Sequence, residues 1–184
     1  MLSKLRKCLL NEKKNKKIFD IVVYGSIVKG KQQSSDIDIA VIFREGSLKD
    51  RLEEIQSIKK QIKNSRKIDI KGILWEELFK QEFFARSGIF LEGISIFDGK
   101  PFANKMDFTA FSIFVYSLKN KTHTEKVKFN YILAGRGKKG MIEHLEGKHL
   151  APGVVQIPMR NALEFEEILN RNGINFEKKE ILIK

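Results

Sequence analysis

The sequence predicts an α/β (α+β) fold, in which a short mixed sheet flanked by helices precedes a small α+β domain. Two apolar segments on either side of a Gly-Ser turn have the pattern of strands, and an amphipathic helix and a third strand-like segment follow them. The composition then changes near Pro101. We therefore expect a first domain over residues 1–101 and a small basic α+β domain over residues 102–184.

Local patterns predict the elements of the first domain. A short N-terminal helix carries Leu2, Leu5 and Leu9 on one side. A longer helix is expected over residues 47–64, because Ser47 and Asp50 form a helix-start signal and apolar residues then recur at steps of three and four. A further amphipathic helix is expected over residues 75–86. Strands are expected at residues 19–24, 36–43, 66–74 and 94–97.

The formal net charge of +12 over 184 residues suits an anionic partner, such as nucleic acid, nucleotide phosphates or an acidic protein. Charge alone, however, favours the alternative explanation of a lysine-rich solvated surface. Cys8 is the single cysteine, which excludes an intrachain disulfide and a cysteine-based zinc cluster, so a cytoplasmic location is the default expectation. No apolar run approaches the roughly 20 residues that span a bilayer, and the N-terminus lacks a signal peptide's apolar stretch, so we expect no membrane partner.

Three aspartates on the predicted strands form a candidate metal site. Asp36 and Asp38 are two residues apart, so both project from one face of their strand. If the strand over residues 66–74 lies beside theirs, Asp69 can join them. Three converging carboxylates repel one another strongly unless a cation is present, and Mg²⁺ or Mn²⁺ takes oxygen ligands. Two such ions about 4 Å apart can activate an attacking oxygen and stabilise a leaving one.

The turn at Gly25 and Ser26 is a candidate phosphate-binding element. Glycine lets a phosphate approach the backbone, serine adds a hydroxyl donor, and a helix that starts here points its free N–H groups at an anion. Lys29 and Lys31 follow in the same loop and can contact phosphates as point charges. Singly, Gly-Ser and Asp-x-Asp are common in solvated strands and turns. Their order, their spacing and the third aspartate together favour a functional explanation.

The order of strand, Gly-Ser, loop, Asp-x-Asp, helix, strand and Asp resembles the nucleotidyltransferase superfamily of the DNA polymerase β type. Within it, the sequence is most similar to the minimal nucleotidyltransferases. The resemblance covers residues 19–101, including the helix-and-strand close of that domain at residues 86–100. It implies transfer of a nucleoside monophosphate to a hydroxyl of a protein, a nucleic acid or a small molecule, with release of pyrophosphate.

The resemblance also implies a role for each candidate residue. Gly25 and Ser26 would bind the nucleoside triphosphate, while Asp36 and Asp38 would bind both metal ions. Asp69 would be the third metal ligand and would help to deprotonate the attacking hydroxyl.

The expected second domain resembles no family, and its charge is its most informative property. Aromatic residues lie among the basic residues between 119 and 139, a pattern that can bind a nucleic-acid backbone and stack bases. The candidate contacts are Lys126, Lys128, Arg136, Lys138 and Lys139. The alternative is an ordinary helix with Phe129 and Ile132 in its core and its lysines in water. Strands are expected at residues 110–118, 154–157 and 174–183, and helices at 123–134, near 145 and after the helix-start signal of Asn161 and Glu164.

We therefore expect a Mg²⁺-dependent nucleotidyltransferase that uses an NTP, with ATP as the expected donor, and modifies an RNA or a protein. The basic second half favours RNA. With a protein acceptor, the expected function is that of an antitoxin that modifies a toxin, because minimal nucleotidyltransferases often pair with helical HEPN proteins. Arg136 and His144 lack the HEPN spacing, so a HEPN-type partner would be a separate chain. A catalytically silent nucleotide- or RNA-binding module is the alternative from another class.

Overall fold

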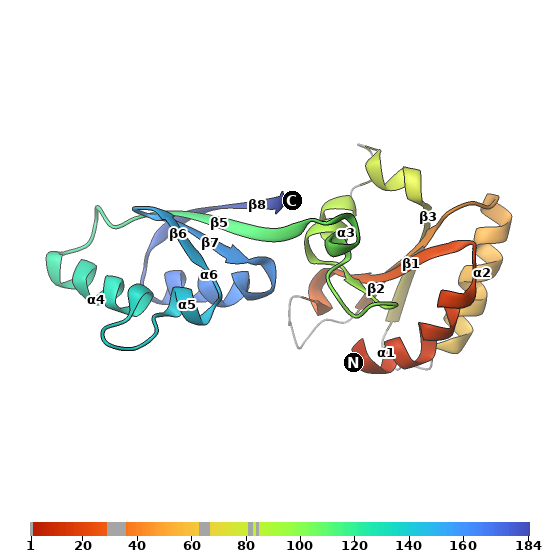
Figure 1. Ribbon diagram of the computed structural model, residues 1–184, viewed down its shortest axis with the longest axis horizontal. Helices are drawn as coiled ribbons and strands as arrows, with labels where there is room; N and C mark the ends of the chain where they lie inside the picture. Colours follow the sequence, from red (N-terminus) through yellow and green to blue (C-terminus); the bar gives the residue numbers. More distant parts are fainter. Residues whose placement is uncertain (1, 29–35, 63–66, 81–82, 84) are drawn as a thin grey trace. The chain divides into compact units, whose positions relative to one another are not determined.

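The structure, a computed structural model, describes residues 2–28, 36–62, 67–80, 83 and 85–184 (Figure 1). The chain divides into two compact units, Met1–Asp107 and Phe108–Lys184. The sequence places this boundary at Pro101. In the structure, Pro101 forms a β-bridge with Ile94, and Phe102 is fully buried in the core of the first unit. The residues just after Pro101 therefore complete the first unit.

The first unit contains a four-stranded sheet with the strand order β3-β2-β1-β4. Its strands are β1 (Ile18–Tyr24), β2 (Asp36–Phe43), β3 (Lys67–Leu74) and β4 (Ile94–Ser95). β1 pairs antiparallel with β2 and β4, whereas β2 pairs parallel with β3. A parallel pair needs a crossover connection, and helix α2 (Leu48–Gln61) lies in that connection. The mixed sheet and its helices confirm the predicted fold class.

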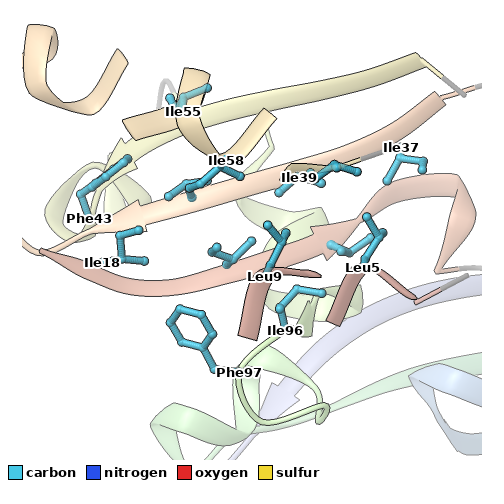
Figure 2. Packing of buried hydrophobic residues seen from close by; sticks show 14 residues of the cluster. Leu5, Leu9, Ile18, Ile37, Ile39, Phe43, Ile55, Ile58, Ile96 and Phe97 are labelled. Carbon is cyan, nitrogen blue, oxygen red and sulfur yellow. The ribbon is translucent and has the colours of Figure 1, made fainter. Parts of the chain in front are cut away.

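One face of this sheet packs against α2 and the N-terminal helix α1 (Leu2–Leu9). Figure 2 shows side chains from both helices beside the isoleucines of β2. The buried residues include Leu5, Leu9, Ile37, Ile39, Ile55 and Ile58. Each fully buried aliphatic side chain stabilises the fold by about 1.5–3 kcal/mol. Ser47 and Asp50 form a capping box at the start of α2, as the sequence predicts.

The other face of the sheet carries a second apolar cluster. Asp36 and Asp38 lie on this face as well, toward one end of the sheet. Val22, Ala40 and Ile42 are fully buried in this cluster. They are covered by residues of η3 (Trp75–Phe79), α3 (Arg86–Glu92) and η4 (Phe102–Met106). Because side chains alternate along a strand, Asp36 and Asp38 project from the same face as Ala40 and Ile42. The apolar cluster thus fixes the direction in which the carboxylates point.

The expected helix over residues 75–86 is wrong. The short 3-10 helix η3 ends at Phe79, and α3 begins only at Arg86. Glu77 accepts hydrogen bonds from the backbone N–H of Leu74 at 2.6 Å and from Arg51 at 2.9 Å. These contacts to β3 and α2 hold the short turn, and amphipathic spacing does not reveal them.

A buried ion pair links β1 to the end of the first unit. Asp20 is fully buried, and Lys105 Nζ lies 3.1 Å from its Oδ2. The same ammonium group lies 2.7 Å from Asp98 Oδ2, and Lys13 pairs with Asp98 Oδ1 at 3.3 Å. Burial raises the pKa of Asp20, and the hydrogen bond from Ser95 and the charge of Lys105 oppose that shift. Lys105 therefore compensates a charge that the sheet has removed from water.

The second unit is an antiparallel sheet with the strand order β6-β7-β5-β8. Its strands are β5 (Thr109–Ser117), β6 (Lys148–Ala151), β7 (Val154–Pro158) and β8 (Asn175–Ile183). The helices α4 (His123–Ala134), α5 (Met141–His144) and α6 (Ala162–Arg171) lie along one face of this sheet (Figure 1). They bury a core that includes Phe114, Phe129, Val155, Phe165 and Leu169.

Two features of the second unit differ from the expectation. The sequence does not predict β6, because all four of its residues are exposed and show no apolar alternation. Helix α6 begins directly after Asn161, as the helix-start signal predicts, but the capping box does not form, because the Asn161 side chain donates to the carbonyl oxygen of Leu145 at 2.9 Å. In both cases a tertiary contact replaces the local pattern.

We predict that Lys105→Met destabilises the first unit by about 3–5 kcal/mol at pH 7, because it leaves the Asp20 carboxylate buried without its cation. The raised pKa of Asp20 favours its protonated form in the folded state, so its contribution to stability is present at low pH and is lost as the pH rises. The deficit of the variant should therefore shrink as the pH falls toward 5. Urea unfolding followed by the fluorescence of Trp75 measures it.

The control for this prediction is Lys13→Met. Lys13 pairs with Asp98 near the surface and does not reach Asp20, so its loss should cost about 1 kcal/mol or less. Equal losses in the two variants, or a deficit for Lys105→Met that does not change with pH, would contradict the assignment to Asp20.

Candidate functional site

The register of the first sheet brings the predicted carboxylates together. Asp38 on β2 is the direct cross-strand partner of Asp69 on β3, and Asp36 lies two residues before Asp38 on the same face. On the other side of β2, Asp38 is the cross-strand partner of Tyr24 at the end of β1. Three neighbouring strands therefore contribute Tyr24, Asp38 and Asp69 to one row across the sheet.

The Gly25 turn lies directly against this row. Gly25 follows β1, opens the short helix η2 (Gly25–Ile27) and has a φ of +80°, which disfavours other residues. A Cβ atom at this position would collide with Oδ2 of Asp38. Only glycine therefore lets the turn approach the carboxylate so closely. Ser26 is the next residue of η2, whereas Lys29 and Lys31 lie outside the described residues.

Burial and neighbouring negative charges shift the pKa values of two residues in this row. The pKa of Asp38 is raised by burial, then by the negative charges of Asp69 and Asp36, and the positive charge of Lys71 opposes the shift. Burial and the charges of Asp38 and Asp69 raise the pKa of Tyr24 to about 12. The carboxylates are thus close enough to repel one another, and a cation bound among them would relieve that repulsion.

The donor set has the chemistry of a site for a hard divalent cation. Its members Asp36, Asp38 and Asp69 offer carboxylate oxygens alone, which suits Mg²⁺ or Mn²⁺. In the described ranges, no three His, Cys, Asp or Glu side chains lie close enough together to hold a metal ion as they stand. The three aspartates thus fit such an ion in residue type, sheet face and register, but their side chains do not converge on one point in this structure.

Three residues of this face escape the sequence-based reasoning: Tyr24, Lys67 and Lys71. Lys67 is the cross-strand partner of Asp36, and Lys71 is the partner of Ala40, so the two lysines flank Asp69 on its own side of β3. The alternation Lys-Ile-Asp-Ile-Lys over residues 67–71 contains this signal, because every second residue of a strand shares one face. No local pattern marks Tyr24, whose position depends on the pairing of β1 with β2.

The basic candidates of the second unit are spread over α4 and the segment after it. Lys128 and Lys138 are exposed, and Lys126 is half-buried. Arg136 lies over the ring of Tyr131, with its Cζ 5.2 Å from the ring centroid, and Lys139 pairs with Glu143 at 2.9 Å. Two of the five candidate cations therefore already have partners within this unit.

The aromatic residues of α4 divide between core and surface. Phe129 is buried, whereas Tyr131 is 46% exposed and Ile132 is 38% exposed. The alternative with both Phe129 and Ile132 in the core is therefore wrong for Ile132. A groove of about 670 Å³ runs beside α4 and is lined by Tyr116, Ser117, Leu118, Asn130 and the residues from His149 to Gly153. It offers polar and aromatic groups next to the basic helix.

We predict that Gly25→Ala lowers any activity of the site by about tenfold or more, because the new methyl group displaces the carboxylate of Asp38. Gly46→Ala is the matched control. Gly46 also has a positive φ, but a Cβ atom there would meet its nearest neighbours at an ordinary 3.8 Å. Both variants should lose roughly 1 kcal/mol of stability from backbone strain. Equal activity of the two variants, measured by nucleotide transfer, would contradict the close approach at Gly25.

No described helix is long and apolar enough to cross a membrane. No curated protein and no solved structure matches the chain. The family model described as polymerase beta, nucleotidyltransferase, matches residues 6–98, about half of the chain. This match includes the Gly25 turn, both residues of the Asp-x-Asp pair and Asp69, and it agrees with the resemblance seen in the sequence. The chain therefore belongs to the polymerase beta nucleotidyltransferase family.

Proposed function

We propose that this protein transfers a nucleoside monophosphate from an NTP, with ATP as the donor, to a hydroxyl of an RNA or protein acceptor. The observation that carries the proposal is the β2–β3 register, which makes Asp38 and Asp69 neighbours while the Gly25 turn lies against Asp38. Membership of a nucleotidyltransferase family supports the reaction class.

On the donor side, Gly25 and Ser26 would hold the triphosphate. The Gly25 turn lies against Asp38, so a phosphate could approach the glycine without a Cβ in the way, and the backbone N–H groups of the turn and the Ser26 hydroxyl would be its donors. Asp36, Asp38 and Asp69 would hold Mg²⁺ or Mn²⁺, which supplies charge neutralisation of the phosphates and acidifies the attacking hydroxyl. The turn that follows β1 and the carboxylates of β2 and β3 would together position the donor.

On the acceptor side, Asp69 is the exposed carboxylate of the row and accepts the proton of the hydroxyl. The hydroxyl oxygen forms a bond to the α-phosphorus as the bond from that phosphorus to the oxygen bridging it to the β-phosphate breaks. Pyrophosphate leaves with that bridging oxygen. Tyr24 borders the row on the β1 side, and its hydroxyl, protonated at neutral pH, can donate a hydrogen bond there.

The second unit supports RNA as the acceptor. Tyr131 exposes its ring with the guanidinium of Arg136 over it, and Lys128 is exposed on the same helix. Proteins that bind single-stranded nucleic acid commonly stack bases on exposed aromatic rings and contact the backbone with neighbouring cations. A hydroxyl of a separate HEPN-type toxin is the alternative acceptor in an antitoxin role, and reversible nucleotide or RNA binding without turnover is the non-catalytic alternative.

The test is transfer of label from each α-labelled NTP, with Mg²⁺ or Mn²⁺, into total RNA and total protein of a lysate. We expect Asp38→Asn to lower transfer by about 100-fold or more, as losing one electrostatic stabiliser of a transition state does. Its melting temperature without metal should be unchanged or about 2–4 °C higher, because the substitution removes a half-buried charge and its repulsion with Asp69.

Asp107→Asn is the matched control. Asp107 is exposed and has a φ of 59°, a conformation that asparagine tolerates, so this variant should keep full transfer and stability. Label in one protein band would support the toxin target. Reversible NTP binding without any transfer would support the non-catalytic alternative. A large loss of metal-free stability in Asp38→Asn would mark Asp38 as structural.

A further inference from the structure

The strand β3 presents two lysines on the face that carries the carboxylates. Lys67, Asp69 and Lys71 alternate with Ile68 and Ile70, which pack into the opposite core. All three polar side chains therefore project from the carboxylate face, and all three are exposed. Each lysine is two residues from Asp69, which is roughly 7 Å along a strand.

Neither lysine is held in an ion pair with a carboxylate of the described residues. Among the described residues, Lys67 and Lys71 form no ion pair, although the charge of Lys71 opposes the raised pKa of Asp38. Lys71 is thus near enough to act on the row but is not paired to it. An exposed ammonium group in this position can bind an anionic oxygen of a substrate.

The strand order decides which substrate these lysines face. The Gly25 turn contacts Asp38 from the β1 side of β2, and β3 lies on the other side of β2. A donor triphosphate held at the turn therefore occupies the β1 side. The acceptor oxygen must approach from the β3 side, next to Asp69 and between the two lysines.

We propose that Lys67 and Lys71 bind a phosphate of the acceptor next to its attacking hydroxyl, and that the acceptor is therefore the end of an RNA chain. This inference rests on the proposed nucleotidyltransferase function. A terminal nucleotide carries a phosphate one sugar away from its 3′ hydroxyl, within the span from Asp69 to either lysine. A serine, threonine or tyrosine of a protein carries no such group, so two lysines around Asp69 favour the nucleic acid.

The test compares two short oligoribonucleotides that differ only at the last internucleotide phosphate, which is either natural or a neutral methylphosphonate. Binding is measured by fluorescence anisotropy, and transfer by incorporation of α-labelled ATP. We expect the full-length wild-type chain to prefer the charged oligonucleotide by about tenfold in both readouts. Lys67→Met/Lys71→Met should lower this preference to about twofold or less. It should leave the Kd for a non-hydrolysable ATP analogue within about twofold of the wild-type value.

Lys49→Met, which removes an exposed lysine of α2, is the matched control and should retain the wild-type preference. Two results would overturn the inference: a wild-type chain indifferent to the neutral linkage, or a double variant that weakens binding of the ATP analogue and keeps the preference. Transfer into protein but not into RNA would also overturn it. A lysine-dependent preference in binding without any transfer would support the lysine site and refute the proposed catalysis, so the two failures are distinguishable.

Discussion

The parallel register of β2 and β3 is the constraint on which the candidate site depends. It places Asp38 directly beside Asp69, although like charges opposite each other in a sheet cost up to about 1 kcal/mol. The apolar residues of β2 outweigh this cost, because each fully buried aliphatic side chain stabilises the fold by about 1.5–3 kcal/mol. A slip of one residue would turn Ile37 and Ile39 out of their core, so packing holds the register and the carboxylates with it.

Two aspartates on the same face of the first sheet, Asp20 and Asp38, have different electrostatic surroundings. Near the start of β1, Asp20 is fully buried, and Lys105 approaches it to 3.1 Å as a dedicated cation. On β2, opposite the last residue of β1, the pKa of Asp38 is raised by burial and by its acidic neighbours, and Lys71 opposes the shift without forming an ion pair among the described residues. A buried carboxylate with its own cation stabilises a fold, whereas neighbouring carboxylates with a raised pKa are typical of a functional site. The contrast separates the structural acid from the candidate functional ones within one short sheet.

The structure shows where some of the cations behind the net charge of +12 lie and which of them already have partners. Lys139 is paired to Glu143, and Arg136 lies over Tyr131, so part of the basic character of the second unit is used inside it. Lys67 and Lys71 remain on the carboxylate face of the first unit. The positive charge nearest the carboxylates therefore lies on β3 of the first unit, and the second unit has an exposed aromatic and cationic surface of its own.

Much of the first unit follows from local sequence. Period-two alternation puts Asp36 and Asp38 on one face, and the start of α2 follows from Ser47 and Asp50, because these relations involve residues only a few positions apart. Tertiary structure decided what spans longer distances: the neighbouring positions of Asp38 and Asp69, the row that includes Tyr24, and the pair of Asp20 with Lys105. It also ended η3 at Phe79, within the helix expected over residues 75–86, and Glu77 of η3 accepts hydrogen bonds from Arg51 and Leu74. A strand pattern shows which face a side chain occupies, but which strands become neighbours is decided by burial of the whole sheet.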